Sequence, residues 1–572
     1  MMPLARLHQG RRSERGSVLP LAMIAMLLFS ILGFTLVAMG TTELTISGSW
    51  KGYSAAFYGA EAGVESAVVA LREILAGTPT PTNAQLAAIT APILPDPKLS
   101  FTTFSVTRVV PAPPYSYPTT FTTGPYSGFS GQVTDYLISS DVQGQNGTKS
   151  RLTQIVRYVQ VPLFQFGVFY GAGVDLEMAP GANMTFNGRV HSNSNIYMGT
   201  DATLSFDSTI TSAGGIFRRI KRDASIPYGS NPQIKDSGGV YRPLNFDHDY
   251  QPGFGSAWAP AAWQAQANST FGNTVRDTTM GVGQIIPPIP ALFYNPVSPD
   301  VIAHQLIEIA DGADAPDLGA AKMFTKAGLR IVDGTATDMY DNPVALPGGV
   351  ITSKTFYDMR EQRMMTIVEV NVGLLRSTGA APANGVLYVA KTGTPGAAVR
   401  LVNGSQLPAQ GLTVVSENPV YVRGDYNTVA KVPAAVLADA ITVLSNNWSA
   451  NNSDTKGALG TNSRPATATT VNAAFALGPS AESALLNGNG QLENDIRFLE
   501  DWNGQNFTYR GSIVDLWHSQ QAVGNWRCCG TGGTNYYTPP TRIWSYDTLF
   551  NTAPPPGTPQ GVLILRGPWA QK

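Results

Sequence analysis

A dense cluster of cations is the first candidate for chemistry in this sequence. It is the segment RRIKR, and its charged residues are Arg218, Arg219, Lys221 and Arg222. Four cations in five residues could contact phosphates and would make DNA binding sensitive to salt. The neighbouring Phe217 and Tyr228 could stack on single-stranded bases. The alternative is a solvated loop whose cations pair with Asp223 and Asp236.

Residues that could support catalysis are scattered along the chain. The five histidines are His8, His191, His248, His304 and His518. They form no H-E-x-x-H pair, and no G-x-S-x-G elbow is present. The segment GVLYVAKT ends in Lys-Thr, but Ala390 occupies the position of the second glycine that a phosphate-binding loop needs. The sequence therefore predicts neither an enzyme nor a cofactor site.

Two groups of acids could bind calcium. One is the triplet Asp-His-Asp at 247–249, and the other comprises Asp311, Asp314 and Asp317. Both lack the glycine and glutamate positions of an EF-hand loop. Aspartates are also common turn residues, so we expect these acids to shape turns and we predict no metal site.

The two cysteines, Cys528 and Cys529, are neighbours. They can form neither a disulfide framework nor a four-ligand zinc site. Either they are two separate thiols or they bond to each other through a strained ring. The redox compartment cannot be inferred from them.

Composition favours an extracellular, β-rich protein of several domains. A chain of 572 residues has room for about two to four folding units. Only 13% of its residues are charged, about half the usual fraction, so uncharged polar residues must cover much of the surface. The 58 glycines and 41 prolines predict frequent turns and short elements. A net charge of −1 provides no overall field toward nucleic acid or membranes.

The N-terminal sequence predicts a helix that can span a membrane. Arginines precede an uncharged run that extends from Ser17 to Thr42. At 1.5 Å per residue this run would be about 39 Å long, enough to cross a bilayer, with the arginine cluster holding the N-terminus in the cytoplasm. The alternative is a cleavable signal peptide, which has a shorter apolar core followed by a small-residue cleavage site; this run is longer, and no clean A-x-A site follows it.

An apolar stripe with alternating steps of four and three continues beyond the uncharged run. Its members are Ile46, Trp50, Tyr53, Phe57, Ala60, Val64, Ala67, Leu71 and Ile74. This spacing predicts that a single helix of roughly 55 residues extends from the membrane into water. The alternative is a membrane anchor followed by a separate core helix.

The N-terminal segment, as far as Leu75, resembles type IV pilin-like proteins, most closely the PilX-type minor pilins of bacterial pilus assembly. The resemblance rests on a basic leader ending in ERG, the uncharged run from Ser17, and AFYGAEAGVESAVVAL at 56–71. It implies that a prepilin peptidase cuts between Gly16 and Ser17 and that the new N-terminus is methylated. Many pilins carry a glutamate five residues after the cut, where this chain has Leu21.

A 20-residue repeat follows a small head. We expect residues 76–163 to form linkers and antiparallel strands, at Gln132–Val142 and Leu152–Val161, laid on the lower part of the helix. Beyond them, MTFNGRVHSNSNIYM at 184–198 aligns with LSFDSTITSAGGIFR at 204–218, and one more step back of the same length reaches Phe164, Phe166, Tyr170 and Leu176. The repeat predicts stacked β-solenoid coils, with an ordinary β-sandwich as the alternative.

The later chain is expected to complete the solenoid. Residues 223–384 would be an insertion with a short helix at Asp300–Ala310. Strand-like stretches then recur at Val386–Val389, Val399–Val402, Leu412–Val415, Val420–Val422 and Ile441–Leu444. The C-terminal segment holds five of the nine tryptophans, Trp502, Trp517, Trp526, Trp544 and Trp569. We expect it to cap the open end of the solenoid, with a ligand-binding surface as the alternative.

The predicted fold is thus α+β and mainly β, with a long pilin helix, a small antiparallel head and a large solenoid. The predicted segments are a leader at 1–16, the helix at 17–75, the head at 76–163, coils at 164–222, an insertion at 223–384, further coils at 385–486 and a Trp-rich cap at 487–572. The layout is also similar to that of competence-associated pilins of the ComZ type.

The predicted function is a minor, tip-located subunit of a type IV pilus, anchored in the bacterial inner membrane and later carried to the cell surface. It would present its solenoid for adhesion or for pilus assembly. The expected partners are the inner membrane, other pilins, the assembly machinery and the prepilin peptidase, and DNA or a surface ligand in addition. The alternatives are a pilus-tip DNA receptor for natural transformation and a static, membrane-anchored protein that binds or degrades polysaccharide.

Overall fold

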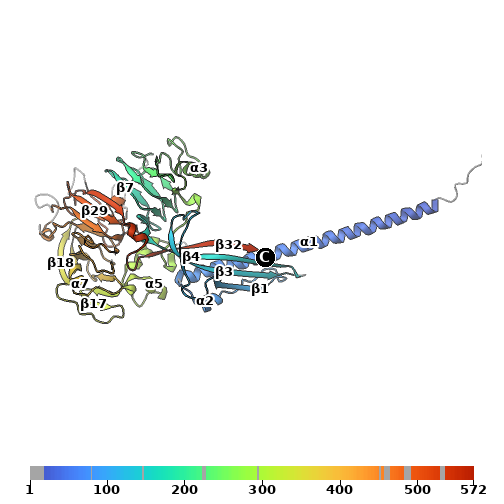
Figure 1. Ribbon diagram of the computed structural model, residues 1–572, viewed down its shortest axis with the longest axis horizontal. Helices are drawn as coiled ribbons and strands as arrows, with labels where there is room; N and C mark the ends of the chain where they lie inside the picture. The colour runs from blue at the N-terminus through green and yellow to red at the C-terminus, as the bar shows by residue number, and fades with distance from the viewer. Residues whose placement is uncertain are drawn as a thin grey trace, which may run out of the picture.

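One long helix and many short strands make up the protein, which is mixed α+β and mostly β. A computed structural model describes residues 18–78, 80–144, 147–221, 227–292, 296–449, 452–456, 464–481, 491–528 and 535–571. Figure 1 shows the helix projecting like a rod from a small sheet, with a larger body of strands at the opposite side of that sheet.

The N-terminal helix α1 is continuous from Val18 to Gly77, over 60 residues. The prediction of a single helix across the apolar run and the amphipathic stripe is therefore confirmed, and a separate anchor and core helix are not found. Pro20 lies in the first turn, where a missing backbone N–H leaves no helical hydrogen bond unmade. The glycines along the helix do not interrupt it.

The head is an antiparallel sheet against the C-terminal half of α1. Its strands run in the order β1 (Ser100–Arg108), β3 (Ser130–Gln143), β4 (Lys149–Pro162) and β32 (Gln560–Gln571), with β2 (Tyr117–Thr120) also paired with β3 and a short helix α2 (Asn83–Ala87) before β1. Ala60, Val64 and Leu71 of α1 are buried in one cluster with Tyr136 and Ile138 of the sheet. The predicted strands of the head are confirmed.

The last strand of the head comes from the other end of the chain. β32 pairs with β4 from Gln560 opposite Pro162 to Gln571 opposite Leu152. Figure 1 accordingly shows the C-terminus beside α1. The whole body is thus inserted between two neighbouring strands of the head.

Parallel strands dominate the body. Its largest sheet has eleven strands, in the order β15 (Val275–Arg276), β11 (Ile210–Ser212), β8 (Val190–Ser192), β5 (Val168–Tyr170), β30 (Ile513–Asp515), β27 (Ala474–Leu477), β24 (Ala434–Ala438), β22 (Leu412–Ser416), β20 (Val386–Ala390), β16 (Leu329–Val332) and β17 (Thr335–Asp338). Only the last pair, β16 and β17, is antiparallel.

Four smaller sheets accompany it. They are β14 (Tyr241–Pro243), β13 (Gln233–Lys235), β10 (Leu204–Phe206) and β7 (Met184–Phe186); β12 (Ile216–Phe217), β9 (Ile196–Met198) and β6 (Leu176–Met178); β18 (Ile351–Asp358), β19 (Arg363–Asn371), β21 (Ala397–Val402), β23 (Val420–Arg423), β25 (Ile441–Leu444) and β28 (Ile496–Arg497); and β26 (Thr469–Asn472), β29 (Asn506–Gly511) and β31 (Thr541–Tyr546).

Short helices lie between the strands. They are α3 (Pro260–Phe271), α4 (Pro299–His304), α5 (Pro316–Ala321), α6 (Met323–Lys326) and α7 (Val372–Ser377), with the 3₁₀ turns η2 (Leu163–Gln165), η3 (Thr278–Met280), η4 (Pro290–Leu292), η5 (Gln305–Ile307), η6 (Ser453–Thr455), η7 (Leu492–Asn494) and η8 (Thr548–Asn551). The short helix expected at Asp300–Ala310 is thus α4 followed by η5.

The 20-residue pairing is confirmed where the repeat is clearest. Met184 pairs with Leu204, Val190 with Ile210 and Ile196 with Ile216, all in parallel register. Each of these apolar residues is buried. Identical positions in successive units therefore stack on one another and fill the interior.

In the unit before the clear repeat, part of the strand pairing has a different register from the one predicted. Leu176 pairs with Ile196, as the repeat predicts, but Tyr170 pairs with Ser192, two positions beyond the predicted partner. The turn between β5 and β6, at 171–175, is two residues longer than the turn at 193–195, so the register shifts by two. Phe164 and Phe166 lie at η2, outside the strands, and pack in a separate apolar cluster.

The later strands have an irregular spacing that a fixed repeat does not describe. Leu412 pairs with Ala434, whereas Ala435 pairs with Ala474, so the second step along the chain is almost twice as long as the first. All five strand-like stretches predicted in this part are strands. Connections of different length between stacked strands account for the weak repeat signal in the sequence.

The segments expected as an insertion and a cap are part of the sheets. β15 and β16, both from residues 223–384, extend the eleven-stranded sheet beyond β11 and β20. β30, from the expected cap, lies in the middle of that sheet between β27 and β5. The C-terminal segment therefore joins the two groups of strands instead of covering an open end.

Close packing of α1 on the head leads to a first prediction. A Cβ atom on Gly63 would lie 2.7 Å from Cε1 of Phe101 and closer still to Oγ of Ser140. We expect Gly63→Ala to lower the free energy of unfolding by about 1–3 kcal/mol because the helix must move away from the sheet. Chemical denaturation of the full chain in detergent measures the change.

Gly48→Ala is the matched control. A Cβ atom on Gly48 has nothing within 4 Å, so this change should leave stability unchanged or raise it by about 0.5–1 kcal/mol through helix propensity. Equal effects at both glycines would contradict the packing argument.

Candidate functional site

The N-terminal half of α1 is an apolar surface without partners among the described residues of this chain. Phe34 is 83% exposed and Leu21 is 67% exposed. The helix is long and apolar enough to cross a membrane, and its most apolar window has no buried residue. Gly16 and Ser17, the predicted cleavage residues, lie outside the described residues.

Two contacts fasten the C-terminal strand to the same helix. The carboxylate of Glu65 on α1 accepts hydrogen bonds from both terminal nitrogens of Arg566 on β32, at 2.5 and 2.6 Å. The side-chain amide of Gln571 donates to the hydroxyl of Tyr53 at 2.5 Å. Bidentate arginine–carboxylate pairs fix orientation as well as distance. The helix that would be held in a membrane is therefore tied directly to the strand that leads to the body.

The basic cluster is largely engaged by its own chain. Arg218 is 1% exposed, and its guanidinium donates to the carbonyls of Tyr228 and Gly229. Arg219 pairs with Asp249 at 2.7 Å, and Lys221 pairs with Asp175 at 3.0 Å. The fourth cation, Arg222, lies outside the described residues.

The aromatic neighbours of this cluster are engaged as well. The ring of Phe217 stacks on that of Tyr197 one unit away, with centroids 5.0 Å apart. The guanidinium of Arg219 lies 4.5 Å from the centre of the Phe217 ring. These contacts follow from the register of the repeat, which places Tyr197 beside Phe217. DNA contact at this cluster stays a prediction that would require some of these pairs to open.

The acids considered for calcium bind to their own chain. Asp247 accepts from the backbone N–H groups of Asp249 and Tyr250. Asp311 accepts from the N–H of Ala313, and Asp314 pairs with Lys322 at 2.8 Å. The part of the chain that the structure describes contains no group of three or more His, Cys, Asp or Glu side chains placed to hold a metal.

Cys528 is disulfide-bonded in the structure. Of the two states considered from the sequence, the described cysteine is thus not a free thiol. Cys529 lies outside the described residues.

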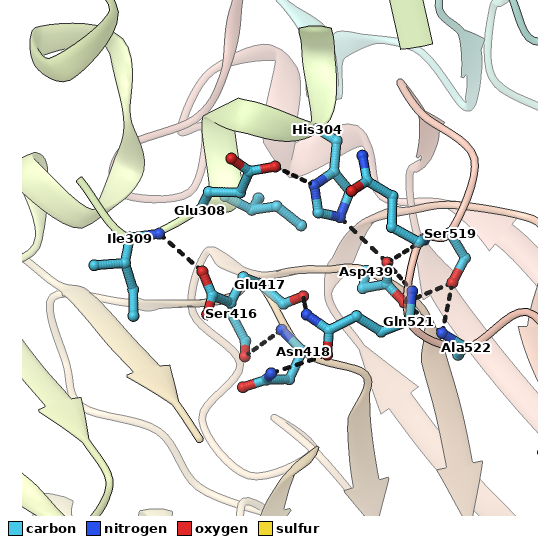
Figure 2. Close-up of polar contacts among 12 residues, drawn as sticks. His304, Glu308, Ile309, Ser416, Glu417, Asn418, Asp439, Ser519, Gln521 and Ala522 are labelled. Carbon is cyan, nitrogen blue, oxygen red and sulfur yellow. Dashed lines mark hydrogen bonds and ion pairs between the residues drawn. The ribbon is translucent and has the colours of Figure 1, made fainter. Parts of the chain in front are cut away.

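A buried polar network, which the sequence analysis missed, joins three segments of the body (Figure 2). Asp439, at the turn between β24 and β25, is fully buried. Its carboxylate accepts hydrogen bonds from Oγ of Ser519 and from the backbone N–H groups of Gln520, Gln521 and Ala522. Nε2 of His304, at the end of α4, lies 3.2 Å from the same carboxylate. The only sequence signal was an acid between two apolar strands.

The imidazole of His304 is the cation of this network. Nδ1 of His304 lies 2.8 Å from Glu308, so carboxylates contact both ring nitrogens. Burial alone would lower the pKa of His304, but the hydrogen bonds to Asp439 and Glu308 outweigh burial and raise the pKa to about 9. The hydroxyl of Ser519 donates to Asp439 and not to His304, so the arrangement differs from a nucleophile–base–acid triad. It is built to fix the loop at 519–522.

A pair of acids inside the body is closed to large substrates. Asp495 and Asp515 are both buried, and the hydroxyl of Tyr170 donates to Asp495. Burial raises the pKa of both carboxyl groups, that of Asp495 to about 6. Paired acids are what a glycosidase uses, but a polysaccharide could not reach this pair without opening the interior.

Comparisons with known proteins give a structural neighbour but no family. No protein-family model matches the chain, and no match was found among curated proteins. A structure search finds the crystal structure of the competence-associated pilin ComZ from Thermus thermophilus. The alignment covers 91% of this chain and 97% of ComZ, at 11% sequence identity and a TM-score of 0.26. A TM-score this low transfers no property from ComZ to this chain.

The contacts of the basic cluster predict that its members contribute differently to the free energy of unfolding. We expect Arg218→Gln to lower the free energy of unfolding by about 2 kcal/mol, because it leaves buried carbonyls without charged donors. Lys221→Gln should cost at most about 1 kcal/mol, because its ion pair is exposed. Denaturation of the full-length variants in detergent measures both. Equal, small losses would show that Arg218 is not a structural residue.

The buried histidine predicts a pH dependence of stability. Because the folded pKa of His304 lies above its unfolded value of about 6.5, its contribution is fully present below pH 6.5 and is lost as pH rises through about 9. We expect the loss to be on the order of 3 kcal/mol, because a shift of one pKa unit corresponds to about 1.4 kcal/mol. His304→Gln keeps a donor without the charge and should flatten the curve of unfolding free energy over this pH range. Parallel curves would contradict the assignment.

Proposed function

We propose that this protein is a membrane-anchored, pilin-like minor subunit of a type IV pilus that displays a large β body at the pilus tip, for adhesion or pilus assembly. The observation that carries the proposal is the division of α1. Its C-terminal half is buried against the head sheet, while the part from Val18 to Thr42 exposes only apolar and small polar side chains.

Such a surface requires an apolar environment. In water, each exposed leucine or phenylalanine of α1 would cost on the order of 1.5–3 kcal/mol relative to burial. A bilayer supplies a suitable environment, and so does a bundle of like helices, because neither brings water to the side chains. A helix that is both membrane anchor and filament core is what a pilin-like subunit needs.

The leader supplies orientation and processing. Arginines before Ser17 favour a cytoplasmic N-terminus, which sends the head and body outside. By resemblance to pilins, a peptidase would cut after Gly16, and the amine of Ser17 would be methylated. Leu21 stands where many pilins carry an acid near this end, and the lack of that acid fits a subunit that is rare in the filament.

The body supports a place at the tip. We interpret its stacked parallel strands as a β-solenoid, because residues at equal positions of successive units pair in register. Most of the chain lies between β4 and β32, so a copy at every position of a filament would crowd its neighbours. A single copy at the end would have room.

The other functions considered have less support. The DNA receptor relied on a basic cluster whose described cations pair with the chain's own acids and carbonyls. The polysaccharide-degrading protein would need acids that a polymer can reach, and the buried pair is closed off. A static membrane anchor remains the alternative that the experiment below separates.

The N-terminal residue of the protein tests the proposal. We expect mass spectrometry of the full-length gene product, from membranes and from sheared pili of a piliated host, to find a mature chain that begins at methylated Ser17. Gly16→Val should block the cut and remove the protein from sheared pili, while it stays in the membrane. Gly10→Val, the same change at the other glycine of the leader, should alter neither result. A wild-type chain that still begins at Met1 would instead establish a static anchor.

A further inference from the structure

A polar groove lies beside the network of Figure 2, with which it shares Glu417, Asn418 and Gln521. Three turns line it: the one after β20 at 391–396, the one after β22 at 417–419, and the loop at 520–523; Arg363 and Met365 of β19 complete the lining. The groove encloses about 450 Å³ and is open to solvent. This volume falls within the range of small-molecule sites.

The floor of the groove is rigid before any ligand arrives. Asn418 is buried, accepts from the backbone N–H of Lys391 at 2.7 Å, and donates to the side chain of Gln521 at 3.0 Å. Gln521 in turn donates to the carbonyl of Glu417 at 2.8 Å. Asp439 fixes the backbone of the loop that carries Gln520 and Gln521. Binding would therefore order few additional groups, which favours affinity.

The rim carries donors with spare capacity. Among the described residues, the side chain of Arg363 forms no ion pair, and its only hydrogen bond is from Nε to the carbonyl of Glu361 at 3.3 Å. The side chain of Gln520, on an exposed residue, makes no hydrogen bond within the described ranges. Lys391 already pairs with Asp333 at 2.6 Å. Arg363 is thus the one cation lining the groove that has no acid as its partner in the described part of the chain.

The charge of the groove decides the class of ligand. A nucleic acid strand is held by several cations along its backbone, and no aromatic ring lines this groove among the described residues. Guanidinium groups bind a carboxylate in a two-pronged geometry. The amide of Gln520 and the hydroxyl of Thr394, two residues that line the groove, suit a ligand rich in hydroxyls. A uronic acid is a ligand of this kind, because it carries one carboxylate among many hydroxyls.

We propose that this groove binds an acidic saccharide, with its carboxylate on Arg363 and its hydroxyls on Gln520 and the neighbouring turns. This inference deepens the proposed function, since it names a ligand class for the displayed body. Binding itself does not depend on pilus assembly, so its failure and the failure of the proposed function are distinguishable: the first is seen with purified protein, the second in the N-terminus and the pilus fraction.

Isothermal titration calorimetry of the full chain in detergent micelles tests the inference. The probes are trigalacturonic acid and the uncharged galactotriose. We expect trigalacturonic acid to bind at one site, about tenfold more tightly than galactotriose, because the carboxylate pairs with Arg363. Arg363→Gln should weaken binding of the acid by about tenfold and leave galactotriose unchanged. Gln520→Ala should weaken both by about threefold.

Lys354→Gln is the matched control. Lys354 is exposed on the adjacent strand β18 and does not line the groove, so its loss removes one positive charge without touching the site. Binding that is undetectable at about 10 mM, that is equal for both sugars, or that falls equally in Arg363→Gln and Lys354→Gln would overturn the proposal. Displacement of the sugar by a single-stranded oligonucleotide would also overturn it, in favour of a general anion site.

Discussion

The contact between the C-terminal half of α1 and the head sheet is the constraint on which the rest of the structure depends. Small residues such as Ala60 and Gly63 let the helix approach the sheet closely. Once that contact forms, the N-terminal half of the helix projects beyond the head, where no described part of its own chain covers it (Figure 1). The helix must then find a bilayer or other helices, which is the physical basis of the proposed function.

The same sheet fixes the body. Because β4 and β32 are antiparallel neighbours, the chain leaves the head and returns to it at adjacent points, Pro162 and Gln560. The arginine–glutamate pair between β32 and α1 adds a direct link from the returning strand to the helix. A force on the body would therefore reach the helix through two paired strands instead of through a single flexible linker.

Inside the body, the repeat in the sequence determines some of the strand pairings, and contacts between distant segments determine the others. Apolar residues at equal positions of the clear repeat pair as their spacing indicates, because backbone pairing between successive units is nearly local. Positions that depend on distant segments do not follow from spacing. β30 pairs with β5 although more than half of the chain separates them, and Asp439 binds a loop that follows much later in the sequence. No periodicity marks such partners, so the network in Figure 2 and the groove beside it could not be found from the sequence.

The sequence alone determined the long helix, the strands of the head and the clear part of the repeat, because each follows from hydrophobic periodicity over neighbouring residues. It also identified every member of the basic cluster. Only the tertiary structure decided what its described members do. The buried guanidinium of Arg218 donates to the carbonyls of Tyr228 and Gly229, and Arg219 and Lys221 pair with Asp249 and Asp175. Likewise, the tryptophan-rich end joins two groups of strands instead of capping one. The reason is the same in each case, since the partner of a charge or of a strand edge is set by how distant segments pack, and composition and spacing carry no record of it.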